Sequence, residues 1–407
     1  MIKEKGLIMK LAQRVMRIKP SATLAINAKA KALQKQGAHI VNFGVGEPDF
    51  DTPQHIQEAA VQAMHEGQTR YTAVSGVDEL KDAVVQALST NYGLAYHRDN
   101  ILVSCGGKHA LYNLLQTIVG PGDEVIIPSP YWVSYPDMVA LAGGTPIFVP
   151  CLEANGFKMQ PDQLEQAITP KTRLLIFNSP SNPTGVHYSR AELTALAEVL
   201  LRYEHVTIAS DDIYYRILFT GHEWANLVMV NPELRDRTFI INGVSKTYCM
   251  TGWRIGYLIG NAQVVKAATD IQSQSTSNPT TISQFAAVAA LRGDQHEVTK
   301  MVRIFEQRCH YVLDRLAALP QVTCPTPAGA FYVFPNCSAY YGRKGPGGMI
   351  ESSLDLSEYL METAHLAVVP GSAFGEDHCI RISYALSMEV LKEGFDRLEK
   401  ALQTLSA

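Results

Sequence analysis

Between residues 101 and 260, short runs of wholly apolar residues alternate with amphipathic stretches of helical periodicity. A strand that reads as a continuous apolar run is typical of a parallel sheet whose crossover helices cover both faces. The pattern therefore predicts an α/β domain with a mostly parallel central sheet. The predicted strands are residues 101–104 (ILVS), 124–128 (EVIIP), 174–178 (LLIFN), 206–210 (VTIAS), 239–243 (FIING) and 254–260 (RIGYLIG).

The pattern changes after about residue 295, where a long charged helix (298–319) is followed by shorter strands such as AFYVFP and IRISYAL. A chain of 407 residues is long enough for two domains. We predict three parts: residues 1–50 as an N-terminal arm that joins the small domain, 51–294 as a large α/β domain, and 295–407 as a small α+β domain. Residues 340–348 (YYGRKGPGG) are predicted to form a surface loop.

Composition favours small-molecule ligands. The 35 basic and 39 acidic residues give neither a nucleic-acid surface nor a polybasic membrane anchor. No apolar run approaches the roughly 20 residues that span a bilayer, and the opening MIKEKGLIMKL lacks the features of a signal peptide, so a cytoplasmic protein is expected. The seven cysteines are scattered without a C-x-x-C pair, which suits reduced thiols, and no metal site is expected.

Polar residues that could take part in binding or catalysis follow three of the predicted strands. Asn182 follows residues 174–178, Asp211 and Tyr214 follow 206–210, and Lys246 follows 239–243. Ligands of open parallel sheets bind beyond the carboxyl ends of the strands. If these strands are neighbours, an amide, a carboxylate, a phenol and an amine meet in one crevice.

A pyridoxal cofactor needs this set of groups. It requires a lysine to form an imine, an acid at the pyridine nitrogen, and donors at the ring oxygen. Its phosphate needs a cradle, and residues 104–108 (SCGGK) follow a strand and open a helical stretch whose N-terminal N–H groups can hold an anion. The guanidinium of Arg254 can bind the same phosphate in bidentate fashion.

Each residue alone also has an ordinary structural explanation. Asn182 can belong to a simple turn, Asp211 can cap a helix, Tyr214 can be a half-buried aromatic, and Lys246 can lie on the surface. Trp132 can belong to the core and Arg381 to an edge strand. The joint order of these residues at successive strand ends favours the cofactor site.

A set of longer motifs covers nearly the whole chain. The most specific is VSKTYCMTGWRIGY (residues 244–257); the others are KPSATLAINAKAKAL (19–33), VGEPDFDTP (45–53), GGKHALYN (106–113), PGDEVIIPSPYWVSYP (121–136), NSPSNPTG (178–185), SDDIYYRI (210–217), PAGAFYVFP (327–335), VVPGSAFG (368–375) and RISYA (381–385). With these motifs the sequence resembles the class I aminotransferases of pyridoxal-phosphate fold type I, in particular bacterial aspartate aminotransferases.

The resemblance implies roles for individual residues. Lys246 would form the Schiff base with pyridoxal 5′-phosphate and move the proton, Asp211 would pair with the pyridinium nitrogen, and Asn182 and Tyr214 would bond the ring oxygen. Further cofactor contacts are implied for Trp132, Gly106, Gly107, Lys108, Ser245, Arg254 and, from the other subunit of a homodimer, Tyr71. Arg381 would clamp the substrate α-carboxylate, with Gly46, Trp132 and Asn182 beside it.

The chain departs from the family pattern at Gly243, where many members carry a serine that binds phosphate. Ser245 or a water molecule is the expected substitute. The family reaction runs in two half reactions, so ping-pong kinetics are expected.

Substrate choice depends on a second cation for the distal carboxylate. Animal-type aspartate aminotransferases use an arginine from the neighbouring subunit, but residues 272–284 (QSQSTSNPTTISQ) contain none. The resemblance to bacterial enzymes offers Lys108 instead, helped by Ser21 and Thr23, and so implies aspartate and glutamate with oxaloacetate and 2-oxoglutarate. Lys108 can equally neutralise the phosphate, and Ser21 and Thr23 can cap a helix.

Other functions stay open at this point. The same fold hosts aminotransferases for prephenate, aromatic amino acids, alanine or kynurenine, and lyases that cleave carbon–sulfur bonds. A regulatory cofactor-binding domain is disfavoured, because no DNA-binding segment is attached. A dinucleotide fingerprint at Gly44 and Gly46 fails, because its third glycine is missing.

Overall fold

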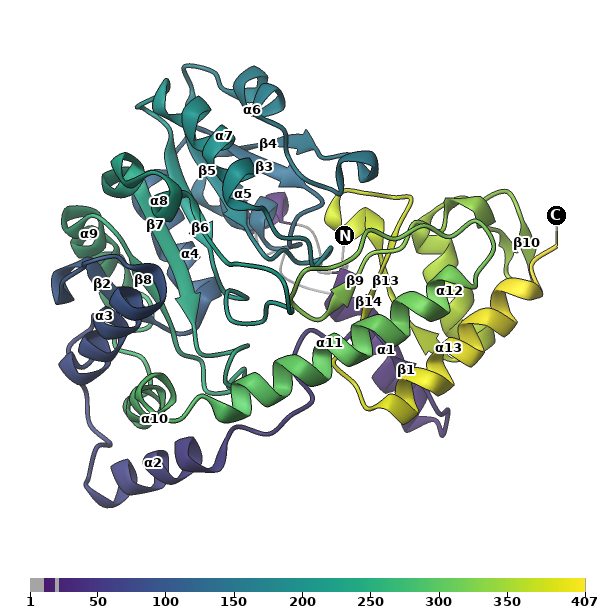
Figure 1. Ribbon diagram of the computed structural model, residues 1–407, viewed down its shortest axis with the longest axis horizontal. Helices are drawn as coiled ribbons and strands as arrows, with labels where there is room; N and C mark the ends of the chain where they lie inside the picture. The colour runs from purple at the N-terminus through teal and green to yellow at the C-terminus, as the bar shows by residue number, and fades with distance from the viewer. Residues whose placement is uncertain (1–10, 19–21, 407) are drawn as a thin grey trace, which may run out of the picture.

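The computed structural model describes residues 11–18 and 22–406, without the side chains of residues 22–25 and 27. A seven-stranded sheet, of strand order β2-β8-β7-β6-β5-β3-β4, forms its centre (Figure 1). Only β8 runs antiparallel to its neighbours. The strands are β2 (Ile101–Ser104), β3 (Glu124–Ser129), β4 (Thr145–Pro150), β5 (Thr172–Asn178), β6 (Thr207–Asp211), β7 (Thr238–Gly243) and β8 (Gly256–Ile259).

The mostly parallel sheet confirms the predicted fold class, with one strand that the sequence pattern missed. The strand β4 carries Pro146 and Pro150, which disfavour a strand assignment. It lies at the edge of the sheet and pairs only with β3, where a missing N–H is tolerated. The strand predicted from Arg254 begins at Gly256.

Helices cover both faces of this sheet. They are α2 (Gln54–His65), α3 (Asp78–Tyr92), α4 (Gly107–Ile118), α5 (Tyr135–Ala142), α6 (Pro161–Ala167), α7 (Arg190–Leu201), α8 (Leu227–Val230), α9 (Ala262–Ser273) and α10 (Thr281–Arg292). Successive strand residues point to opposite faces. Leu102 therefore packs in the core with α4, α5 and α9, whereas Ile101 and Val103 pack with α2, α3 and α10. Ile126 lies in the core with α6, α7 and α8.

The C-terminal part is built from short strands and long helices. Three strands form an antiparallel sheet of order β13-β14-β9, and two form the hairpin β10–β11 inside the segment predicted as a loop. The elements are α11 (His296–Ala317), β9 (Tyr332–Val333), β10 (Lys344–Gly345), β11 (Gly348–Met349), α12 (Ser353–Ala364), β12 (Leu366–Ala367), β13 (Val369–Pro370), β14 (Ile380–Ser383) and α13 (Met388–Gln403). Figure 1 shows α11 running alongside both parts of the molecule.

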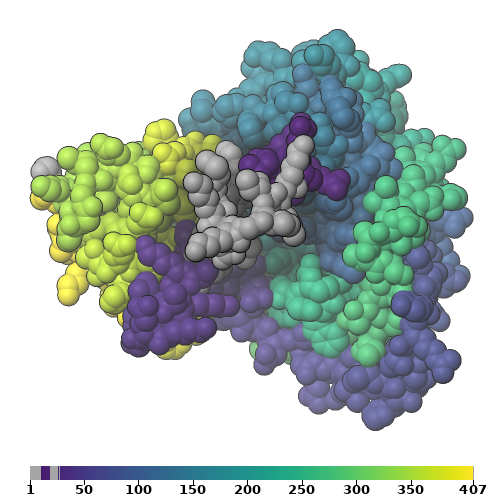
Figure 2. Space-filling view, turned by 180° about the vertical axis from the view of Figure 1, so that it is seen from behind, coloured from purple at the N-terminus to yellow at the C-terminus, as the bar shows by residue number. Residues whose placement is uncertain are grey.

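The N-terminal segment lies against the C-terminal part. Strand β1 (Val41–Asn42) pairs in parallel with β12, and Ser383 N donates to Phe43 O at 2.8 Å. Figure 2 shows the purple segment that contains α1 (Ala22–Lys35) beside the yellow-green C-terminal residues. The residues after β1 also contact the loop that follows β7: Gly46 O accepts from Lys246 Nζ, and Thr52 Oγ1 donates to Cys249 O.

In the part of the chain that the structure describes, none of the helices has the length and apolar character needed to cross a membrane.

Gly243 pairs with Gly256 where β7 and β8 approach closely. A Cβ on Gly243 would lie 2.8 Å from Ile255 O and 2.9 Å from Gly256 Cα, so a side chain collides with backbone. We expect Gly243→Ser to lower the free energy of unfolding by about 1–3 kcal/mol, measured by chemical denaturation. Gly347→Ser, with nothing within 4 Å of its Cβ, serves as the neutral control. Unchanged stability in Gly243→Ser would contradict this packing argument.

Candidate active site

A cavity of about 340 Å³ opens beyond the carboxyl ends of β5, β6 and β7. Within the described residues, its lining includes four cationic side chains and one acidic side chain, so the lining favours anionic ligands. The lining residues are Gly46, Gly107, Lys108, Trp132, Val133, Ser134, Tyr135, Asn178, Asn182, Asp211, Ile213, Tyr214, Ser245, Lys246, Thr251, Arg254, Tyr332 and Arg381.

Lys246 projects into this cavity from the loop that follows β7. Its Nζ donates a hydrogen bond to Gly46 O at 2.5 Å. Burial lowers the pKa of Lys246 to about 8; Glu47 opposes this shift, and Arg381 and Arg254 add to it. About a tenth of the amine is therefore unprotonated at pH 7, far more than for an ordinary lysine, and only this form is a nucleophile.

Asp211 ends β6 at the floor of the same cavity. Tyr135 OH donates to Asp211 Oδ2 at 2.7 Å, and Ile213 N donates to Oδ1 at 3.3 Å. Burial raises the pKa of Asp211 to about 6, although the bond from Tyr135 lowers it. The carboxylate is thus buried, ionisable near neutrality and held in one orientation.

Sequence analysis missed two residues that hold Asp211: Tyr135 bonds its carboxylate, and Asn178 bonds its backbone carbonyl. Tyr135 stands three residues after Trp132, in the first turn of α5, a spacing that brings both rings to one side of the helix start. Asn178 ends β5; its Nδ2 donates to Asp211 O at 2.8 Å and its Oδ1 accepts from Asn182 N at 3.0 Å. The position of Asn178 at a strand end was the available signal.

Arg381 forms a second buried group with Asn182. Its Nη1 donates to Asn182 Oδ1 at 3.1 Å and its Nη2 donates to Gly44 O at 2.9 Å, while Nε has no partner. The guanidinium lies 4.6 Å from the Tyr332 ring centroid, and Tyr332 OH lies 3.1 Å from Tyr214 OH. Burial lowers the pKa of Arg381, and the hydrogen-bond partners of its guanidinium within the described residues are the neutral oxygens of Asn182 and Gly44. Such a cation is suited to a carboxylate ligand.

The N-terminus of α4, together with Arg254 and Lys108, forms a part of the cavity wall that is suited to binding an anion. Gly106 caps α4 with φ of 91°, a conformation that favours glycine, and the Arg254 guanidinium packs against it. Arg254 Nη2 donates to Cys105 O at 3.2 Å. Lys108 Nζ lies 4.8 Å from the Trp132 ring centroid. The pKa of Lys108 is lowered, mainly by burial and to a smaller extent by the positive charge of Arg254.

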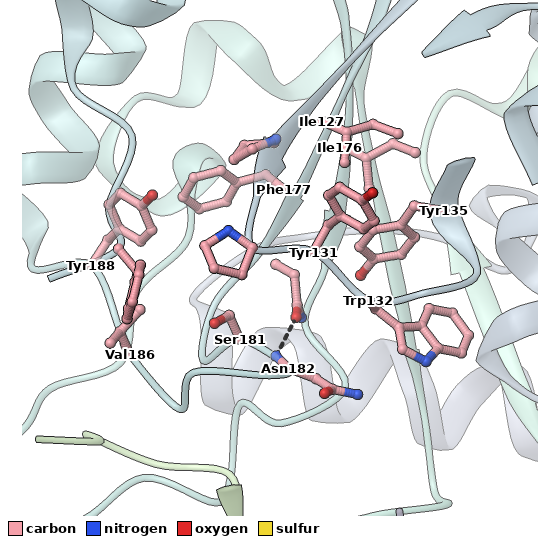
Figure 3. A pocket seen from close by; sticks show the side chains of 14 residues that line it. Ile127, Tyr131, Trp132, Tyr135, Ile176, Phe177, Ser181, Asn182, Val186 and Tyr188 are labelled. Atoms are coloured by element: carbon pink, nitrogen blue, oxygen red, sulfur yellow. Dashed lines mark hydrogen bonds between the residues drawn. The ribbon is translucent and has the colours of Figure 1, made fainter. Parts of the chain in front are cut away.

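A smaller cavity of about 30 Å³, room for one water molecule, lies beside the first. It shares Trp132, Tyr135, Asn178 and Asn182 with the main cavity. Figure 3 shows Trp132 and Tyr135 next to each other and the bond between Asn182 and Asn178. The Trp132 ring meets that of Tyr135 edge-on at 5.3 Å, which fixes its plane.

Four of the predicted site residues are not among the residues that line the cavity in this structure. Tyr71 lies outside the lining and exposes 91% of its surface. Ser21 lies outside the described residues, and so does the side chain of Thr23, which belongs to α1. Gly106 adjoins the lining residue Gly107. The other predicted site residues line one cavity.

The model of the family "Aminotransferase class I and II" matches residues 38–398. The chain belongs to this family. An aspartate aminotransferase of Geobacillus stearothermophilus is 48% identical over 97% of this chain and 99% of its own length. A probable aspartate/prephenate aminotransferase of Rickettsia bellii is 50% identical over 95% and 98%. The resemblance found in the sequence is thereby confirmed, and the protein is an aminotransferase.

Solved structures of this family share the fold. The aspartate aminotransferase from Rhizobium meliloti superposes with a TM-score of 0.95 at 44% identity, over 98% of this chain and 100% of the other. A Thermus thermophilus aspartate aminotransferase with maleate gives a TM-score of 0.89 at 40% identity, over 97% and 100%. The predicted fold type is therefore confirmed over the whole length of these relatives.

The lowered pKa of Lys246 predicts how cofactor attachment depends on pH. Only the unprotonated amine attacks a carbonyl, so the rate of attachment of pyridoxal 5′-phosphate to the cofactor-free protein should rise with pH and level off above about 8. Stopped-flow absorbance measures this rate. Lys246→Ala should abolish attachment, whereas Lys266→Ala, at an exposed lysine, should leave the profile unchanged. A plateau only near pH 10.5 would contradict the lowered pKa.

Proposed function

We propose that this aminotransferase uses pyridoxal 5′-phosphate to move an amino group between L-aspartate or L-glutamate and the 2-oxo acids 2-oxoglutarate and oxaloacetate. The observation that carries the proposal is one cavity that holds Lys246, with its lowered pKa, the buried carboxylate of Asp211, and the buried cation Arg381. Lys246 supplies the amine that forms the imine. Asp211 supplies an acid for the electron-withdrawing ring, and Arg381 supplies a cation for the substrate α-carboxylate.

The residues present fit the cofactor. Lys246 supplies the amine, Asp211 can hold a proton on the pyridine nitrogen, and the α4 N-terminus with Arg254 can bind the phosphate. When bound, pyridoxal 5′-phosphate supplies a carbonyl carbon that takes the amino group and a ring that withdraws electrons from the substrate α-carbon. Asp211 stabilises the charged ring nitrogen because it carries a negative charge once its own proton is lost near pH 6.

Further contacts position the ring and the phosphate. Asn182 and Tyr214 would hold the ring oxygen, and Trp132 would help to hold the ring. Gly106, Gly107, Ser245, Arg254 and Tyr71 of the partner subunit would hold the phosphate, with Lys108 beside it. Ser245 is buried in the cavity wall and supplies a hydroxyl where the backbone at Gly243 cannot accept a side chain.

Lys246 also moves the proton of the reaction. Its Nζ takes the proton from the substrate α-carbon and delivers it to the carbon that receives the amino group. The 2.5 Å bond from Nζ to Gly46 O keeps the amine on the side of the cavity where Arg381 lies. A second 2-oxo acid then takes the amino group in the reverse direction, which gives ping-pong kinetics.

Substrate binding uses both ends of the cavity. Arg381 clamps the α-carboxylate, helped by Asn182, Trp132 and the backbone at Gly46. Among the described residues no carboxylate pairs with Lys108, so its cation is available for the distal carboxylate. Ser21 and Thr23, outside the described region, would assist it. The Thermus thermophilus relative with maleate carries a four-carbon dicarboxylate, in agreement with this assignment.

Prephenate is the second candidate substrate, because several relatives are named aspartate/prephenate aminotransferases. Prephenate also carries a second carboxylate, so the same Lys108 serves it. Aromatic amino acids and alanine lack that group and should be poorer substrates. A carbon–sulfur lyase would instead release ammonia and pyruvate steadily, which an ammonia assay distinguishes.

The functional unit is a homodimer in the cytoplasm. The ring of Tyr71 stands out from the surface and is available to a second subunit. Sharing a phosphate ligand in this way makes each cofactor site complete only in the dimer.

The proposed function is tested by the visible spectrum of the purified protein. The absorption band of the bound cofactor should bleach on addition of L-aspartate and return with 2-oxoglutarate. Lys246→Ala should show no such cycle. A band that responds to alanine or an aromatic amino acid but not to aspartate would keep the cofactor and overturn the dicarboxylate specificity.

A variant of Lys108 distinguishes a role in substrate binding from a role in phosphate binding. We expect Lys108→Met to raise the KM for aspartate about tenfold or more, with a much smaller effect on alanine, because only aspartate loses a charge partner. Steady-state kinetics measure both. Lys158→Met, whose Nζ pairs with Glu192 at 2.7 Å away from the cavity, is the matched control. An equal loss for both substrates, with weaker cofactor binding, would assign Lys108 to the phosphate alone.

A further inference from the structure

The segment 69–77 combines an exposed ring with a firmly held backbone. Tyr71 exposes 91% of its surface, and Val61 and Met64 on the neighbouring helix α2 are also exposed. A loop that presents a side chain to another molecule gains precision when its own backbone has few alternatives. Figure 2 shows the green segment of α9 and α10 beside the blue-purple segment of α2 and α3.

Gln284, on α10, holds the segment on the C-terminal side of Tyr71. Its Oε1 accepts from Val77 N at 2.8 Å, and its Nε2 donates to Thr72 Oγ1 at 3.3 Å and to Pro279 O at 2.9 Å. The side chain is completely buried, so water does not compete for these bonds. One amide thus fixes two points of the segment.

Thr281 and Gln272 fix two more points. Thr281 Oγ1 donates to Arg70 O at 2.8 Å, directly before Tyr71, and Gln272 Nε2 donates to Val74 O at 2.9 Å. All three anchoring residues therefore come from residues 272–284, the stretch that lacks the substrate-binding arginine. Its buried polar side chains hold a neighbouring segment instead.

Gln272 also reaches the phosphate cradle of its own subunit. Its Nε2 donates to Val103 O at 2.8 Å, and its Oε1 accepts from Ser104 Oγ at 2.7 Å and Asn113 Nδ2 at 2.9 Å. Ser104 ends β2, and Asn113 belongs to α4, whose N-terminus forms the cradle. One buried amide therefore aligns the cradle and the Tyr71 segment on a common frame.

We propose that Gln272, Thr281 and Gln284 are positioning residues that hold segment 70–77, so that the Tyr71 hydroxyl reaches the cofactor phosphate in the partner subunit. The inference rests on the proposed function, because it requires a bound cofactor and a homodimer. A hydrogen bond weakens steeply with distance and angle, so a small shift of the segment weakens phosphate binding across the interface.

A double-mutant cycle tests this. Thr281→Val removes one buried bond from a hydroxyl to a carbonyl, and Thr238→Val is its matched control, since Thr238 Oγ1 donates to Leu234 O at the same 2.8 Å elsewhere in the fold. We expect Thr281→Val to raise the cofactor dissociation constant about three- to tenfold, and Thr238→Val less than about twofold. In the Tyr71→Phe background the effect of Thr281→Val should disappear.

Two results overturn the inference while the proposed function stands: an unchanged dissociation constant in Thr281→Val, or an equal loss in the presence and absence of the Tyr71 hydroxyl. Gln284→Leu should also raise the cofactor dissociation constant, by about tenfold. If Gln284→Leu does not fold, the threonine cycle decides alone. Absence of saturable cofactor binding in the unmodified dimer would remove the proposed function, and this inference with it.

Discussion

The site depends on the parallel pairing of β6 between β5 and β7. In this register Asn178 stands opposite Asp211, and Asp211 stands opposite Ile241. Because parallel strands end at the same edge of the sheet, the residues that follow each end converge. The amide of Asn182, the carboxylate of Asp211 and the amine of Lys246 all follow from this arrangement. A change of register by one residue would turn Asp211 away from the cavity.

The cavity concentrates buried charge that the protein alone does not neutralise. Burial raises the pKa of Asp211 and lowers those of Lys246 and Arg381. Isolated buried charges are costly, and opposite charges on a ligand offset that cost. A phosphate and a carboxylate are ligands of the right sign for the two ends of the cavity. The excess of positive charge in the cavity therefore favours anionic ligands.

Residues 43–52 join the parts of the molecule around the cavity. Gly44 O accepts from Arg381, Gly46 O accepts from Lys246, and Asp49 forms two hydrogen bonds with Arg308 of α11 at 2.7 and 2.9 Å. The Arg308 guanidinium is buried, so this ion pair is well shielded from solvent. The side chains that line the cavity are thus held by segments that are far apart in the sequence.

The sequence by itself determined the fold class and the family, and it predicted most of the residues that line the cavity. Apolar runs identify buried strands, and the order of polar residues after them identified Asn182, Asp211, Tyr214 and Lys246, because local pattern and chain order are written in the sequence. It missed β4, whose prolines are compatible only with the edge position that the other strands leave to it.

Only the tertiary structure decided which side chains support these residues. Tyr135 bonds Asp211 across 76 positions, and Gln284 bonds Val77 across 207. Likewise, the close approach of β7 and β8 explains why position 243 has no room for a side chain. Such contacts depend on the packing of remote segments, and residue spacing carries no information about them.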